Sequence, residues 1–169
     1  TRLSRGLGDV YKRQDKVGAL TVFQRHPNWS VPLNNRDITK AEMADIRQRY
    51  EEIFAVCAES NGGFDHLPDQ RVYENVSVEE RRALWDALYD APGFALLLAN
   101  FRETFLEAEP NRDLSDYVAE RIRARVNDPQ VAEKLIPRDH GFGMRRMPME
   151  TGYFEAYNRD NVRLVSLLD

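Results

Sequence analysis

A block of helical periodicity over residues 39–136 constrains the fold of this chain more than any other feature. Thr39 with Glu42, and Ser77 with Glu80, have the spacing of capping boxes, which begin helices. Behind these starts, apolar residues recur at the three- and four-residue spacing of a helix face that packs into a core. The expected faces are Met43, Ile46, Tyr50, Ile53, Phe54 and Cys57; Leu84, Trp85, Leu88 and Tyr89; Phe94, Leu97, Leu98, Phe101 and Phe105; and Leu114, Tyr117, Val118, Ile122 and Val126.

Glycine, proline and polar residues divide the block into helices. Asn61-Gly62-Gly63 ends the first predicted helix and Pro92-Gly93 ends the second, because glycine and proline are favoured at and after helix ends. The fourth is expected to follow residues 111–113. Asp128-Pro129 supplies an N-cap with proline at the first helical position, which predicts a short last helix to Leu135. Residues 64–76 are expected to be irregular.

Two strand-like segments flank the helical block. Residues 20–24, rich in β-branched and aromatic side chains, predict a buried strand that ends in a turn at Arg25-His26-Pro27. Residues 161–165 predict a second strand, after a short helix or turn at 152–157. A lone strand at each end of a helical block implies a sheet with further strands outside this sequence. We therefore expect a mostly α-helical fragment of an α/β protein.

Composition excludes several classes of protein. The net charge of −4 argues against a general nucleic-acid binder, which needs a basic surface. A single cysteine, Cys57, allows no internal disulfide, and no Cys/His spacing indicates a metal site. The longest apolar run, residues 94–99, is much shorter than the roughly 20 residues of a membrane span. With no signal-peptide pattern at the start, we expect a cytoplasmic protein with neither nucleic-acid nor membrane partners.

Residues 1–14 show neither strand alternation nor a helical stripe. The run from Gly6 to Gln14 is similar to adapter read-through at the ends of assembled sequences. We interpret residues 1–14 as non-native and exclude them from the fold prediction.

The segment around Arg145 and Arg146 has the composition of a functional loop. It lies between a Gly141-Phe142-Gly143 turn and Pro148, and it carries no helical apolar stripe. Proline biases the residue before it toward extended geometry, in which neighbouring side chains point to opposite faces. One arginine could therefore bind a phosphate on one face of the segment, and the other could face a reacting centre on the opposite face.

Several separate motifs, taken in order, resemble the Baeyer-Villiger monooxygenases. The motifs are residues 20–34 (LTVFQRHPNWSVPLN), 134–137 (KLIP), 142–148 (FGMRRMP) and 157–164 (YNRDNVRL). The resemblance covers residues 15–169. It implies FAD and NADPH as cofactors, a ketone and O2 as substrates, and two Rossmann-type domains, of which the NADPH domain contains a helical insertion. The chain would then comprise a strand and turn of that domain in 15–38, the helical insertion in 39–136, and a cofactor loop with a return strand in 137–169.

The resemblance also implies roles for five residues. Arg25 and Arg145 match positions that bind the 2′-phosphate of NADPH, and Gln24 and His26 flank Arg25 as further cofactor-binding candidates. Arg145 stands where a lysine is common, and this exchange keeps the charge. Arg146 matches the arginine beside the flavin and is the expected catalytic residue.

The chain also departs from the family pattern. The glycine loops that bind FAD and NADPH, and the family fingerprint, would precede residue 15 and are not present, which indicates an internal fragment that is inactive alone and needs the rest of its parent chain. His66 and His140 have no partner that would make them a base or a ligand. Two alternatives remain open, a related flavin monooxygenase acting on amines or sulfides, and a non-catalytic helical interaction module.

Overall fold

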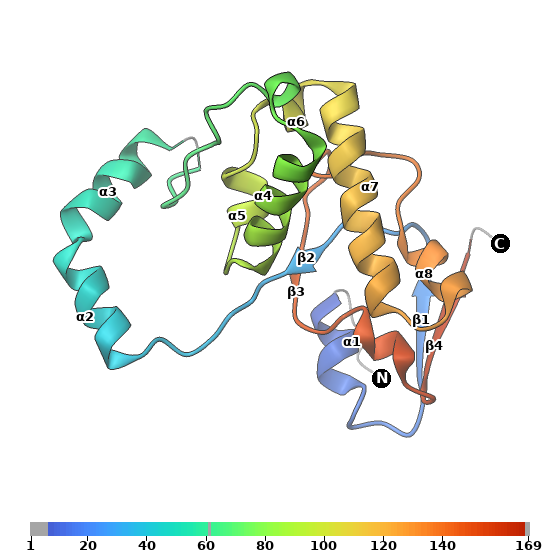
Figure 1. Ribbon diagram of the computed structural model, residues 1–169. Helices are drawn as coiled ribbons and strands as arrows, with labels where there is room; N and C mark the ends of the chain where they lie inside the picture. Colours follow the sequence, from blue (N-terminus) through green and yellow to red (C-terminus); the bar gives the residue numbers. More distant parts are fainter. Residues whose placement is uncertain (1–6, 61, 168–169) are drawn as a thin grey trace. The chain divides into compact units, whose positions relative to one another are not determined.

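The computed structural model describes residues 7–60 and 62–167. The chain forms two compact units (Figure 1). Thr1–Pro32 and Phe105–Asp169 form the first, here called the sheet unit, and Leu33–Thr104 forms the second, here called the helical unit. The chain passes from the helical unit back to the sheet unit within α6 (Glu103–Leu106).

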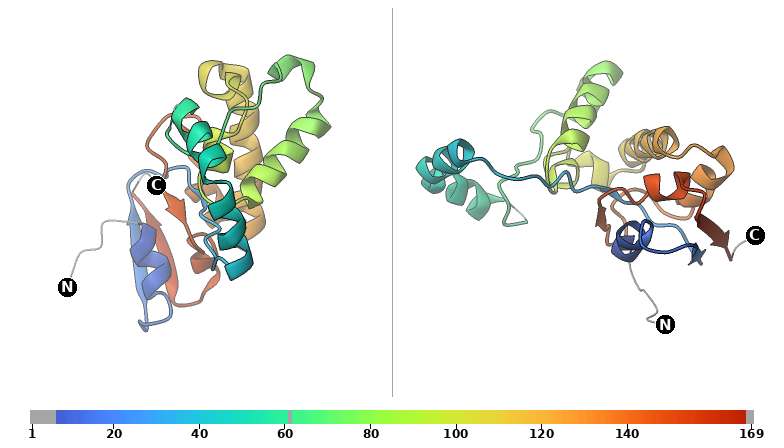
Figure 2. Two further views of the ribbon diagram at one scale, coloured as in Figure 1. Left: turned by 90° about the vertical axis from the view of Figure 1, so that its left-hand side faces the viewer. Right: turned by 90° about the horizontal axis from the view of Figure 1, so that it is seen from below.

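Two pairs of parallel strands organise the sheet unit. β1 (Leu20–Gln24) lies beside β4 (Val162–Ser166) in a register that pairs Leu20 with Val162 (Figures 1 and 2). The shorter β2 (Val31–Pro32) lies beside β3 (Met149–Glu150). Both predicted strands are thus confirmed, and they pair with each other. The prediction that the first strand is buried is wrong. The residues of β1 alternate between half-buried and exposed, and the Phe23 side chain is 69% exposed.

Helix α7 (Ala108–Arg125) lies in the core of the sheet unit. Its predicted face is confirmed, since Leu114, Val118 and Ile122 are fully buried and Tyr117 nearly so. The helix begins earlier than predicted, because Pro110 lies in its first turn, where proline needs no hydrogen-bond partner. The short α8 (Pro129–Leu135) has the predicted cap, in which Asp128 accepts from the amides of Gln130 and Val131.

Two further elements complete the sheet unit. Residues 155–158 form a 3-10 helix, η2 (Glu155–Asn158), as the short helix or turn expected there. Helix α1 (Leu7–Arg13) was missed, because residues 7–13 have only one buried apolar residue, Val10, and so no stripe to detect. The expectation of no regular structure is therefore wrong for 7–13. Residues 1–6 lie outside the described part of the chain.

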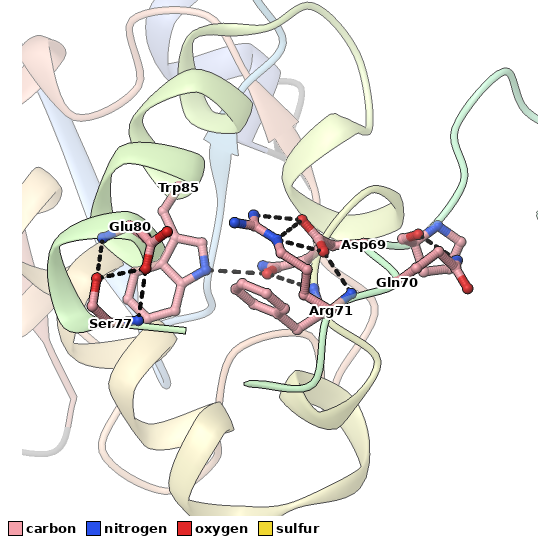
Figure 3. Close-up of polar contacts among 9 residues, drawn as sticks. Asp69, Gln70, Arg71, Ser77, Glu80 and Trp85 are labelled. Atoms are coloured by element: carbon pink, nitrogen blue, oxygen red, sulfur yellow. Dashed lines mark hydrogen bonds and ion pairs between the residues drawn. The ribbon is translucent and has the colours of Figure 1, made fainter. Parts of the chain in front are cut away.

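Both predicted capping boxes are present in the helical unit. Thr39 begins α2 (Lys40–Gln48) and Ser77 begins α4 (Val78–Asp90), each with the reciprocal glutamate contact. Figure 3 shows the second box, in which the Ser77 amide and hydroxyl donate to Glu80. Of the predicted α4 face, Trp85 and Tyr89 are buried.

Two of the predicted helices are divided. The first is interrupted at Arg49, so that α3 (Tyr50–Glu59) follows α2. Their predicted face is not core, because no described residue of either helix is buried and Phe54 is 64% exposed. The third becomes α5 (Ala95–Leu98) and α6, because the Asn100 side chain between them accepts from the Trp85 indole at 3.1 Å and the Phe101 amide at 2.8 Å.

Residues 64–76 are irregular as expected, apart from η1 (Tyr73–Asn75). Tyr73 is buried and meets the Phe101 ring edge-on at 5.5 Å. Arg71 forms a bidentate pair with Asp69 nearby, with Nε donating to Oδ1 and Nη2 donating to Oδ2 (Figure 3). The segment is therefore fixed by side-chain contacts rather than by a regular element.

Within the described residues, no helix is long and apolar enough to cross a membrane. The same residues contain no cluster of three His, Cys, Asp or Glu side chains that could hold a metal ion.

Candidate functional site: a tethered arginine loop

The arginine loop, residues 139–148, is anchored in the core of the sheet unit by Phe142. This ring is fully buried and lies edge-on to Trp29, with ring centroids 6.3 Å apart. Two side chains of α7 bind its backbone. Ser115 Oγ accepts from the Phe142 amide at 2.9 Å, and Asn111 Nδ2 donates to the Phe142 carbonyl at 2.9 Å. The loop is therefore fixed at its centre, and the backbone N–H and C=O of buried Phe142 are both satisfied.

The glycines of the loop allow this anchoring rather than mobility. A Cβ atom at Gly141 would lie 1.8 Å from Asn111 Oδ1, a distance that no side chain can occupy. Gly143 has a φ of 75°, in the left-handed region that favours glycine. The turn expected at 141–143 is present, with a close approach to α7 as its physical reason.

A segment more than a hundred residues earlier binds the other side of the loop. Asn28 Nδ2 donates to the Arg146 carbonyl at 3.0 Å, and Trp29 Nε1 donates to the His140 carbonyl at 2.9 Å. Directly after these residues, β2 pairs with β3, so the two segments stay side by side beyond the loop. The loop thus lies against the segment that follows β1, so the two motifs that carry the arginines meet in the sheet unit.

The two arginines have different surroundings. Arg145 Nη2 donates to Asp139 Oδ2 at 2.9 Å, and both side chains are about half exposed. The Arg146 side chain is exposed, and no hydrogen bond or ion pair to it is found in the described part of the chain. Glu150, four residues further along the chain, is buried and pairs with Arg125 at 2.7 Å. The Arg146 side chain therefore lies at the surface, whereas the Arg145 guanidinium is held by Asp139.

An aspartate and a histidine beside Arg145 were missed as site residues. His140 Nδ1 lies 2.7 Å from Asp139 Oδ1, and His140 Nε2 lies 3.1 Å from Asn28 Oδ1. The prediction that His140 has no such partner is wrong, because one partner is its sequence neighbour and the other is 112 residues away. The His140 ring and then the Arg145 guanidinium hold the pKa of the Asp139 carboxyl below its usual range.

The remaining predicted residues lie where β1 ends. Arg25 and His26 are exposed, three and two residues before Asn28, and neither has a partner among the described side chains. Gln24 differs from them, because its Nε2 donates to the Lys134 carbonyl at 2.6 Å. The Gln24 side chain therefore already joins β1 to the end of α8.

Two asparagines of the motif at 157–164 make structural contacts. Asn158 donates to the Arg125 carbonyl at 2.8 Å and accepts from the Asn127 amide at 2.8 Å. Asn161 Nδ2 donates to the carbonyls of Gln14 and Val17. These asparagines satisfy backbone groups where other elements end, which explains their place in the motif without a ligand.

Comparison with known proteins shows which enzymes this chain is similar to. No family model matches the chain. The 2-oxo-Δ3-4,5,5-trimethylcyclopentenylacetyl-CoA monooxygenase of Pseudomonas putida is 48% identical over 148 residues, which are 88% of this chain and 27% of that protein. A Baeyer-Villiger monooxygenase of Pseudooceanicola batsensis is 32% identical over 149 residues, again 88% and 27%. The crystal structure of OTEMO in complex with FAD and NADP is 45% identical, with a TM-score of 0.89, over 94% of this chain and 29% of that one.

The chain is thus homologous to one segment of the flavin-dependent Baeyer-Villiger monooxygenases. It spans about 27% of the length of the curated relatives it matches. The resemblance found in the sequence motifs is confirmed.

Proposed function

We propose that this chain is part of a monooxygenase that oxidises a ketone to an ester or a lactone with NADPH and O2. One oxygen atom enters the bond between the carbonyl carbon and its neighbour, and the other leaves as water. NADPH and a proton supply the two electrons and the hydrogens that this water needs. The observation that carries the proposal is the arginine loop, which holds Arg145 and Arg146 against the segment that contains Arg25.

The exposed cations of the sheet unit fit the NADPH phosphate. Arg25 lies directly after a parallel strand, in the region where α/β sheets bind cofactors. A guanidinium presents paired donors that match phosphate oxygens. Arg25 and Arg145 would bind the 2′-phosphate, with His26 beside them and Gln24 positioning the strand end. Bound NADPH would supply a hydride, and bound FAD would pass its electrons to O2.

Arg146 is the proposed catalytic residue. Its guanidinium stays charged at any working pH, and its five donors lie in one rigid plane. It would stabilise negative charge that develops on the substrate carbonyl oxygen, and Asn28 holds the backbone from which the guanidinium extends.

We also propose the domain division. Residues 15–38 and 137–169 would belong to a Rossmann-type NADPH domain, with 39–136 as its helical insertion. The parallel pairing of β1 with β4 supports this division, because parallel neighbours need a long crossover between them. Helices α7 and α8 lie within the sheet unit, so the last two helices of the insertion would anchor it to the NADPH domain.

A chimeric enzyme tests the proposal. Residues 15–169 would replace the matching segment of the Pseudomonas putida relative, which supplies the rest of the chain. We expect the purified chimera to hold FAD and to convert a cyclic ketone to a lactone at the expense of NADPH and O2, measured by product mass and by oxygen uptake. N-oxide or sulfoxide formation without lactone would instead support the alternative of an amine or sulfide monooxygenase. A flavin-loaded chimera that oxidises none of these would contradict both.

Replacement of Arg25 and Arg145 by alanine in this chimera tests their proposed role. Each is expected to lose charge-assisted hydrogen bonds worth about 1.5 to 3 kcal/mol, so the KM for NADPH should rise by roughly tenfold or more per residue. The KM for NADH, which lacks the 2′-phosphate, should stay nearly unchanged. Steady-state kinetics with both cofactors provide the measurement, and equal losses for both would mean that the arginines act structurally.

A further inference from the structure

His140 is bonded at both ring nitrogens, and each bond leads to one of the two arginines. On one side, the Asp139 carboxylate receives the His140 ring on Oδ1 at 2.7 Å and the Arg145 guanidinium on Oδ2 at 2.9 Å. On the other side, Asn28 meets the ring through Oδ1 at 3.1 Å and donates from Nδ2 to the Arg146 carbonyl at 3.0 Å. We infer that His140 is the positioning residue for both arginines of the loop.

The direction of these bonds follows from the network. The Arg146 carbonyl is an acceptor, so the Asn28 amide must turn its NH2 group toward it and its oxygen toward the ring. Asp139 also presents an oxygen to the ring. Both neighbours of the imidazole therefore present oxygen atoms to the ring.

The ring is held firmly enough to position other groups. The His140 side chain is only 6% exposed, and its own carbonyl accepts from the Trp29 indole at 2.9 Å. Rotation of the ring would break both of its bonds at once. A site that stabilises charge loses much of its effect when its groups move by about an ångström, so a residue that fixes the Arg145 guanidinium and the Arg146 backbone contributes to the site.

The catalytic consequence rests on the proposed function, but the positioning itself does not. Two substitutions at His140 separate its bond to Asp139 from its bond to Asn28. The amide nitrogen of asparagine occupies a position near that of Nδ1, and the amide nitrogen of glutamine reaches a position near that of Nε2. His140→Asn should keep the bond to Asp139 and lose the bond to Asn28. His140→Gln should keep the bond to Asn28 and lose the bond to Asp139.

Nuclear magnetic resonance of the isotope-labelled 169-residue chain tests each of these bonds without any cofactor. In His140→Gln the Asp139 carboxylate loses its bond to the ring, so its bond to Arg145 should open more often. Hydrogen exchange of the Arg145 guanidinium with water should then accelerate by up to about tenfold, the scale of that one charge-assisted bond. The carbonyl carbon shift of Arg146 should stay at its original value. In His140→Asn the opposite is expected, with a displaced Arg146 carbonyl resonance and a protected Arg145. His66→Asn, at a histidine in the helical unit, is the control and should change neither.

A ring that merely fills space predicts a different result. Both variants would then disturb both probes equally, or neither would disturb either, and each of these outcomes overturns the inference. If a variant at His140 fails to fold, Asn28→Ala replaces it, because the described contacts of Asn28 lead to Arg145 through the His140 ring. Exchange of the Arg145 guanidinium should then accelerate, and an unchanged rate would overturn the inference. A chimera without activity would count against the proposed function alone, because these resonances require no catalysis.

Discussion

Arg146→Ala in the chimeric enzyme is expected to lower ester formation by at least about 10²-fold, the usual effect of removing one donor that stabilises a developing oxyanion. FAD binding and NADPH consumption should continue, because the proposed phosphate contacts belong to Arg25 and Arg145. The variant should therefore oxidise NADPH without making a matching amount of ester. Cofactor oxidation and product formation, measured separately on the same sample, give this ratio.

Because the Arg146 side chain is exposed, its replacement by alanine should leave the fold unchanged. Its side chain contributes no described contact to the fold, and the contact from Asn28 is to its backbone carbonyl, which alanine retains. Arg163→Ala is the matched control, since Arg163 is an exposed arginine on β4. It should leave the ratio unchanged. Ester formation at the original rate in Arg146→Ala would contradict the catalytic role and leave the arginine loop as a structural element.

Local rules predicted the parts of the fold that local interactions determine. The capping boxes at Thr39 and Ser77 and the cap at Asp128 form as expected, because each needs only residues within one turn. The buried face of α7 follows from its periodicity. The same periodicity failed for α2 and α3, because an apolar stripe predicts a buried face only where the chain supplies something to cover it.

The site was only half predictable for a similar reason. Arg25, Arg145 and Arg146 could be found from motifs, since each lies within a recognisable local pattern. The contacts of His140 could not, because Asn28 is distant in sequence and nothing near either residue indicates their meeting. The division of the third predicted helix depends in the same way on the contact of Asn100 with Trp85. Periodicity does not indicate which side chains bind groups distant in the sequence. The aspartate next to His140 was a weak sequence signal of the contact between Asp139 and His140.

Phe142→Ala should destabilise the sheet unit by about 3–5 kcal/mol, the usual cost of removing a fully buried phenylalanine. The cavity would lie beside Trp29 and α7, and two rigid elements cannot readily collapse into it. Urea unfolding followed by circular dichroism measures the loss as a lower midpoint at an unchanged slope. Phe23→Ala is the control in the same unit, because this ring is 69% exposed and should contribute much less.

Loss of this anchor should also release the arginine loop before the chain unfolds. Trypsin cleaves after arginine, and its access to Arg145 and Arg146 depends on how often the loop opens locally. In Phe142→Ala, peptides that end at these residues should appear much earlier in a timed digest than peptides that end at Arg123 within α7. Mass spectrometry of the digest identifies each site. If cleavage in the loop and in α7 accelerates equally, Phe142 stabilises the whole unit without anchoring the loop, and the two arginines are held by Asn28 and the β2–β3 ladder instead.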